Sequence, residues 1–92
     1  RDFVHVNDVV DALIMVSKTN IKKAVYNIGS GQLTTIKQLA NLMRGKIEYT
    51  NPRAIDISAY ANVKRIRKDL NWRAKIPLEE GIANILKDLK QD

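Results

Sequence analysis

Tyr60 and Lys64 stand four positions apart, a spacing that can serve proton transfer when both residues lie on one helix. A lysine cation in that position lowers the pKa of a tyrosine, which can then act as a general acid or base. Asn62, between them, is a typical helix N-cap residue, so Tyr60 should precede the helix that carries Lys64. The two side chains would then not share a face, and catalysis by this pair is not expected.

Gly29, Ser30 and Gly31 follow a β-rich run and invite comparison with the glycine-rich turns that bind dinucleotides. That fingerprint requires a third glycine three residues beyond the second, but Thr34 stands there. The residues therefore predict a tight turn rather than a phosphate-binding loop.

The single histidine and the absence of cysteine exclude several kinds of site. There can be no disulfide and no thiolate metal site, and a structural zinc site is not expected. His5 has no serine or cysteine partner motif, which favours a packed histidine over a general base. No apolar run is long enough to cross a membrane.

The net charge of +6 and the pI of about 9.8 favour an anionic partner. Nucleic acid, an acidic membrane surface and a phosphate-bearing small molecule all satisfy this condition. Residues 64–68 include four cations that would form a basic helix face. A solvated surface is the favoured interpretation of this face, because no base-reading or stacking residues accompany it.

The chain of 92 residues, 45% of them apolar, has the length and composition of a single globular domain. Apolar residues at helical spacing predict helices over about residues 9–18, 36–44, 63–70 and 78–89. Residues 25–28 and 47–49, and less clearly residues 3–6, have the composition of short strands. Four helices with two or three short strands predict a small α/β fold.

Local signals mark the ends of the predicted helices. Asn7 or Asp8 can cap the first, and Thr35 with Gln38 has the spacing of a capping box at the second. Asn62 can cap the third, and Trp72 should anchor the core just after that helix ends. These signals are independent of the hydrophobic periodicity and support the same helices.

Several segments together resemble one family, in the right order. Residues 1–8 (RDFVHVND) resemble the Arg-Asp-aromatic-aliphatic-His-Val-x-Asp motif of the extended short-chain dehydrogenases, the NAD-dependent sugar-nucleotide epimerases and dehydratases. Residues 26–40 resemble their next strand, turn and helix, residues 52–56 their Arg-x-x-Asp segment, and residues 69–82 their closing helices. The resemblance covers essentially the whole chain and is greatest to the 4-epimerases of UDP-sugars.

The resemblance implies a C-terminal, substrate-binding portion, residues 1–92, of a longer enzyme. The N-terminal Rossmann domain of such an enzyme binds NAD and supplies the catalytic residues. The resemblance further implies a cytoplasmic homodimer that acts on a nucleotide-diphosphate sugar, with a UDP-sugar as the leading candidate. It implies no activity for this chain alone. A sugar-nucleotide dehydratase or reductase, a basic nucleic-acid-binding module and a scaffold domain are the alternatives.

Five residues of this chain match the family's substrate contacts. Arg1 and Arg53 match arginines that contact the diphosphate, and Asp56 matches an acid that contacts the ribose. Phe3 and Tyr60 match positions beside the nucleotide. Two arginines can each bind phosphate oxygens through two hydrogen bonds, and a carboxylate can accept from ribose hydroxyls. The alternative for Arg53 and Asp56 is a surface ion pair, which would contribute little stability.

Overall fold

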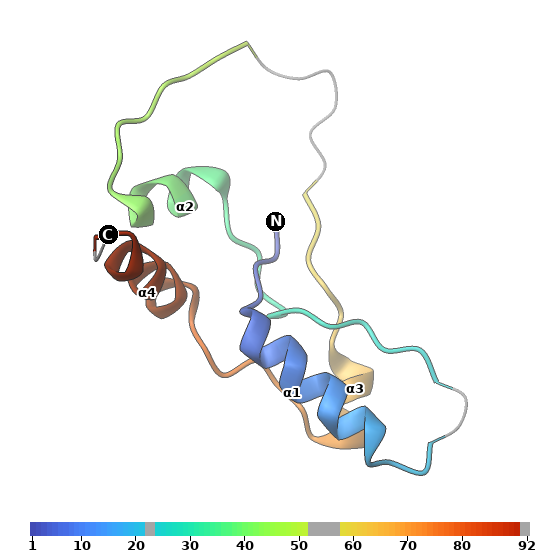
Figure 1. Cartoon of the computed structure of the whole chain (residues 1–92). Coiled ribbons are helices and arrows are strands. Elements are labelled where there is room, and N and C mark those ends of the chain that lie inside the picture. The colour runs from blue at the N-terminus through green and yellow to red at the C-terminus, as the bar shows by residue number, and fades with distance from the viewer. Residues whose placement is uncertain (22–23, 52–57, 91–92) are drawn as a thin grey trace.

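The computed structural model describes residues 1–21, 24–51 and 58–90. These residues form four α-helices joined by long irregular segments (Figure 1): α1 (Val6–Ser17), α2 (Ile36–Met43), α3 (Lys64–Leu70) and α4 (Leu78–Lys90). The four helices predicted from the hydrophobic periodicity are therefore confirmed, with boundaries shifted by at most a few residues.

The predicted α/β fold is wrong, because the described residues contain no β-strand and the fold is helical. A strand is held by hydrogen bonds to a neighbouring strand, and neither residues 25–28 nor residues 47–49 have such a neighbour in the described chain. Val25 is 79% exposed and Tyr49 is 81% exposed. β-propensity reflects the fit of a side chain to a half-buried sheet, and these segments have no sheet to join.

The helix caps partly follow the sequence signals. His5 caps α1, because its Nδ1 accepts a hydrogen bond of 3.0 Å from the Asn7 amide. The predicted cap at Asn7 or Asp8 is wrong, since both residues lie inside the helix. The capping box of α2 is confirmed: the Thr35 hydroxyl accepts from the Gln38 amide at 3.1 Å, and Gln38 Oε1 accepts from the Thr35 amide at 2.8 Å.

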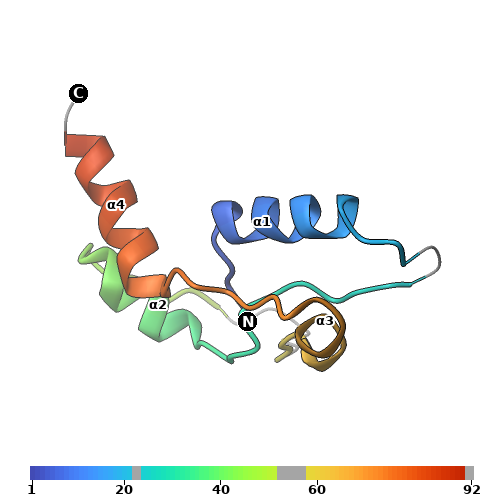
Figure 2. The ribbon, with the colours of Figure 1, turned by 90° about the horizontal axis from the view of Figure 1, so that it is seen from below.

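A small core lies between α1 and α3. Its buried apolar members are Ala12, Val63, Ile66 and Trp72, none more than 5% exposed. Trp72 is 3% exposed, which confirms its predicted role as a core anchor. The helices α2 and α4 pack against each other on the other side of the molecule (Figure 2).

The chain has an open, flat shape, with extents of 48 × 38 × 16 Å. Its radius of gyration is 16.1 Å, whereas a compact domain of this length has about 12 Å. Its accessible surface is 8034 Å², whereas a compact monomer of this mass exposes about 5,400 Å². Much apolar surface therefore remains available for packing.

Candidate functional site

The Asp2 carboxylate joins three segments that are far apart in the sequence. Its Oδ1 accepts hydrogen bonds from the Ser30 amide at 2.8 Å and from the Ser30 hydroxyl at 2.6 Å. Its Oδ2 accepts from the amides of Gly31 and Ala61, each at 3.0 Å. A carboxylate offers about four acceptor positions, so the capacity of Asp2 is filled. We call Asp2, Ser30, Gly31 and Ala61 the Asp2 junction.

The junction holds Asp2 in its charged form. Burial raises the pKa of Asp2, but the Ser30 hydroxyl and the amides of Ala61, Ser30 and Gly31 together lower it by more. The pKa of Asp2 therefore lies below the ordinary value of an aspartate. All four hydrogen-bond donors are neutral, so the junction needs no bond from a neighbouring cation.

Two glycines allow this close approach. A Cβ on Gly29 would lie 2.7 Å from the Ala61 Cβ and 2.8 Å from Asp2 Oδ2. Gly31 has a φ of +76°, in the left-handed region that favours glycine. The turn predicted at residues 29–31 thus directs amides at Asp2, and these amides are not available to a dinucleotide phosphate.

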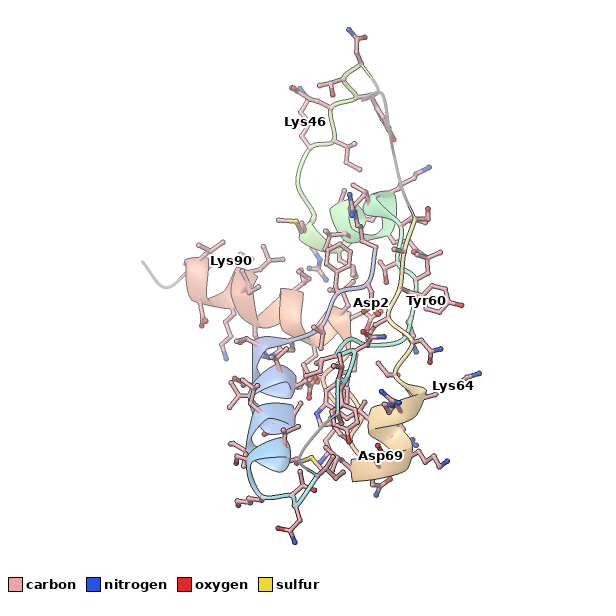
Figure 3. The ribbon with its side chains drawn as sticks, turned by 90° about the vertical axis from the view of Figure 1, so that its right-hand side faces the viewer. Asp2, Lys46, Tyr60, Lys64, Asp69 and Lys90 are labelled. Carbon is pink, nitrogen blue, oxygen red and sulfur yellow. The ribbon has the colours of Figure 1, made fainter. Side chains whose placement is uncertain are left out.

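The Asp2 junction links the first residues of the chain to the segment that contains Tyr60, because the Asp2 side chain accepts from the Ala61 amide. Arg1 also pairs with Thr34: its amino group donates to the Thr34 oxygen at 3.0 Å, and the Thr34 amide donates to the Arg1 oxygen at 2.8 Å. Tyr60 immediately precedes Ala61, and its side chain is 63% exposed and lies on the same side of the molecule as Asp2 in Figure 3. The Arg1 side chain is also exposed.

Tyr60 borders a shallow hollow of about 400 Å³ that Gly31, Lys64 and Arg67 also line. Lys64 begins α3 and Arg67 follows one turn later, so two cationic side chains border the hollow. Tyr60 lies before α3, as predicted, and no shared helix aligns it with Lys64 as an acid–base pair. The hollow has the charge expected of an anion-binding surface.

Phe3, the remaining described candidate, does not line this hollow. Phe3 borders an apolar hollow of about 480 Å³ beside α2 and α4, whose lining includes Leu39, Met43, Ile82 and Ile85. Arg53 and Asp56 lie outside the described residues. Among the described candidates, Tyr60 thus borders the cationic hollow and Phe3 the apolar one, and the exposed Arg1 directly precedes Asp2.

Two further candidates from the sequence have structural partners. His5 caps α1 and also faces Gly81 of α4, where an added Cβ would lie 3.2 Å from its Cδ2. Arg65, on the basic face of α3, donates through Nη1 to the Val25 oxygen at 3.3 Å. Part of that face therefore contacts the segment of residues 25–28 through Val25.

The sequence did not predict that Asp2 and Asp8 would form hydrogen bonds that join distant segments. Their side-chain hydrogen bonds reach partners 28 to 68 positions away, which no local spacing reveals. One signal was present for Asp8: it shares a helix face with Ala12 and Met15, at positions i, i+4 and i+7. An acid on an apolar face indicates a buried, hydrogen-bonded carboxylate.

The described residues lack two other kinds of site. They contain no group of three or more histidine, cysteine, aspartate or glutamate side chains placed to bind a metal ion. None of the helices in this part of the chain has both the length and the apolar character needed to cross a bilayer.

Comparison with protein-family models gives no match, whereas comparison with individual proteins does. UDP-arabinose 4-epimerase 1 of Arabidopsis thaliana is 34% identical over 84 residues, which are 82% of this chain and 20% of that protein. The UDP-glucose 4-epimerase of Thermotoga maritima, solved with UDP-glucose, matches 99% of this chain with a TM-score of 0.87 and 30% identity. RMD from Pseudomonas aeruginosa, solved with NADPH, matches 99% with a TM-score of 0.87 and 27% identity.

These matches cover only part of each relative. The chain spans between 20% and 32% of the length of the curated relatives it matches, and 31% and 33% of the two solved chains. Over its own length, however, its relatives are sugar-nucleotide epimerases, reductases and dehydratases, which confirms the resemblance seen in the motifs. This chain belongs to the extended short-chain dehydrogenase/reductase family.

Proposed function

We propose that this chain is the C-terminal, substrate-binding portion of an NAD-dependent sugar-nucleotide epimerase similar to UDP-glucose 4-epimerase. The observation that carries the proposal is the TM-score of 0.87, over 99% of the chain, to such an epimerase solved with UDP-glucose. The sequence identity of 30% over the same match supports more than a shared fold. The activity belongs to the complete enzyme, since the chain spans 31% of that relative.

In this proposal the chain holds the nucleotide diphosphate of the substrate. Arg1 and Arg53 bind the diphosphate, Asp56 accepts hydrogen bonds from the ribose, and Phe3 and Tyr60 lie beside the nucleotide. The Asp2 junction supports the part played by Arg1 and Tyr60, because the bond from the Ala61 amide to the Asp2 carboxylate links the residues that adjoin them in the sequence. Bonds between a guanidinium and phosphate oxygens are charge-assisted and strong, so the arginines would supply much of the affinity.

The cofactor belongs to the rest of the enzyme. Among the described residues, the amides of the 29–31 turn that could hold a pyrophosphate are bonded to Asp2, so this turn does not fit NAD. Hydride removal and return at C4 of the sugar would depend on that other part. RMD, solved with NADPH, supports a nicotinamide cofactor for enzymes of this kind. This chain alone should be inactive.

The exposed apolar surface supports a covering domain, for which we propose the N-terminal Rossmann domain of the same enzyme. Val6, Val10 and Leu13 follow one face of α1 and are 66%, 44% and 59% exposed. Burying such a stripe stabilises a domain interface by about 25 cal/mol per Å². The proposal includes a cytoplasmic homodimer, as the family resemblance implies.

The proposal is tested by the kinetics of the full-length enzyme with UDP-glucose. Arg1→Ala and Arg53→Ala should each raise the KM for UDP-glucose about tenfold to hundredfold, because each removes a hydrogen bond to a charged group. Arg73→Ala is the matched control, since Arg73 is exposed and lies beside the C-terminal half of α1. Interconversion of UDP-glucose and UDP-galactose by the 92-residue chain alone would overturn the proposal.

A sugar-nucleotide reductase or dehydratase is the second candidate. RMD has the same TM-score of 0.87 as the epimerase, so the fold alone does not separate the two activities, and this observation favours a second candidate. An epimerase returns the hydride to the sugar and shows no net change in the absorbance of the reduced cofactor. Stoichiometric consumption of NADPH with a keto-sugar nucleotide would identify a reductase, and loss of water without net oxidation a dehydratase.

A further inference from the structure

We propose that Asp2 is a positioning residue that sets the distance between Arg1 and Tyr60 and so couples phosphate binding to nucleotide binding. The inference rests on the proposed function, because it assigns Arg1 to the diphosphate and Tyr60 to the nucleotide. It adds a residue whose side chain contacts neither part of the ligand.

The coupling follows from chain connectivity. Asp2 is bonded covalently to Arg1, and Ala61 is bonded covalently to Tyr60. The hydrogen bond of 3.0 Å from the Ala61 amide to Asp2 Oδ2 therefore completes a link between the two proposed ligand-binding residues. The link consists of this bond and the two covalent connections. Without that bond, the segment before α3 would lose its direct attachment to the first residues of the chain.

In the described part of the chain, the segment before α3 has one other hydrogen bond to a distant residue. Among the described residues, Asn27 Nδ2 donates to the Asn62 oxygen at 3.5 Å, at the outer limit of a hydrogen bond. The bond from Ala61 to Asp2 is shorter, and it is the one that reaches the segment carrying Arg1. Asp2 therefore has more control over the position of Tyr60 relative to Arg1 than Asn27 has.

The junction also leaves Arg1 free for an anion. The four acceptor positions of the Asp2 carboxylate are filled by neutral donors: two amides and a hydroxyl from the 29–31 turn, and the Ala61 amide. An aspartate with vacant acceptor positions would compete with phosphate for the neighbouring guanidinium. Asp2 is saturated, so it can anchor the backbone of Arg1 without capturing its side chain.

The test compares three ligands on the full-length enzyme: UDP, uridine and inorganic pyrophosphate. UDP would engage both Arg1 and Tyr60, uridine only the Tyr60 side, and pyrophosphate only Arg1. Asp2→Asn keeps the shape of the side chain but turns one acceptor into a donor that faces donors. It should weaken UDP binding about tenfold or more and weaken uridine or pyrophosphate by less than about threefold.

Matched variants make the outcome decisive. Asp11→Asn, on the exposed side of α1, should leave all three affinities unchanged. Ser30→Ala removes one donor of the junction and should weaken UDP in the same direction by a smaller factor, which keeps the test valid if Asp2→Asn does not fold. In the Asp2→Asn background, a further Arg1→Ala should weaken UDP less than it does in the natural protein.

Equal weakening of all three ligands, or unchanged UDP binding in both junction variants, would overturn the positioning role. If the unsubstituted enzyme bound neither UDP nor UDP-sugars, the proposed function would fail first. The two failures are thus separated by the behaviour of the unsubstituted enzyme.

Discussion

Trp72 donates its indole Nε1–H to the backbone oxygen of Asp8 at 3.1 Å, across 64 positions of sequence. The carboxylate of the same Asp8 accepts from the amides of Lys75 and Ile76 at 3.1 and 3.0 Å. One residue of α1 therefore holds the segment that connects α3 to α4 at two places. Because Asp8 is only 2% exposed, water cannot readily replace these bonds.

The first prediction concerns this buried carboxylate. Asp8→Ala should lower the free energy of unfolding by about 2–4 kcal/mol, since it leaves two backbone amides without an acceptor. Asp8→Asn should cost less, because its amide oxygen still accepts one of the two bonds. Urea unfolding followed by far-UV circular dichroism measures both. Asp11→Ala, on an exposed position of the same helix, should change the free energy by less than about 0.5 kcal/mol, and equal effects at the two positions would contradict the prediction.

The helices were predictable because their signals are local. Periodic apolar residues and the capping box of Thr35 and Gln38 act within a few positions of the chain, and the structure retains them. His5 was not foreseen as a cap, because histidine is not among the preferred N-cap residues, whereas Asn7 and Asp8, two and three positions later, are. Asp8, one of the two expected caps, instead forms the buried bonds to Lys75 and Ile76.

The strands could not be predicted in the same way, because a strand depends on a partner. Residues 25–28 have the composition of a strand, yet their described hydrogen bonds run to α3 and to Asn62 just before it, as in the bond from Arg65 to the Val25 oxygen. The candidate site was likewise predicted only in part. The family resemblance picked out Arg1 and Tyr60, whereas the carboxylate of Asp2, which links their segments, bonds to partners up to 59 positions away.

The second prediction is a pH dependence that arises from Asp2. Its pKa in the folded chain is lowered, so its contribution to stability is complete above the ordinary aspartate pKa of about 3.9. That contribution is lost as the pH falls through the lower pKa of the folded chain. The urea concentration at the midpoint of unfolding should therefore decrease as the pH is lowered from about 5 to about 2. Asp2→Asn should make this decrease less steep. Asp11→Asn should keep the original slope; identical slopes in the two variants would exclude Asp2 as the source.

The third prediction concerns Tyr26, whose hydroxyl donates to Asp69 Oδ2 at 2.9 Å. Burial, this hydrogen bond and the charge of Asp69 raise the pKa of Tyr26, and the Arg65 cation opposes them only in part. In an ultraviolet titration of the three tyrosines, Tyr26 should ionise above the ordinary pKa of about 10. The stability from this bond is present at lower pH and is lost as the pH rises through the raised pKa.

Two variants assign that late ionisation. Tyr26→Phe should remove it from the titration, and Asp69→Asn should move it to lower pH, because the neutral amide no longer repels the phenolate. Tyr60→Phe, a change at an exposed tyrosine, should leave the late component in place. If Tyr60→Phe removed the late component instead, the assignment to Tyr26 would be wrong.

The last prediction tests how tightly the Asp2 junction is packed. In Gly29→Ala the new Cβ would lie 2.7 Å from the Ala61 Cβ and 2.8 Å from Asp2 Oδ2, closer than such atoms approach in proteins. The junction must open, so the free energy of unfolding should fall by about 1–3 kcal/mol. UDP affinity should fall with it, because the link between Arg1 and Tyr60 is displaced. Gly45→Ala is a matched control, since nothing lies within 4 Å of its added Cβ, and the two substitutions behaving alike would show that the junction can yield without cost.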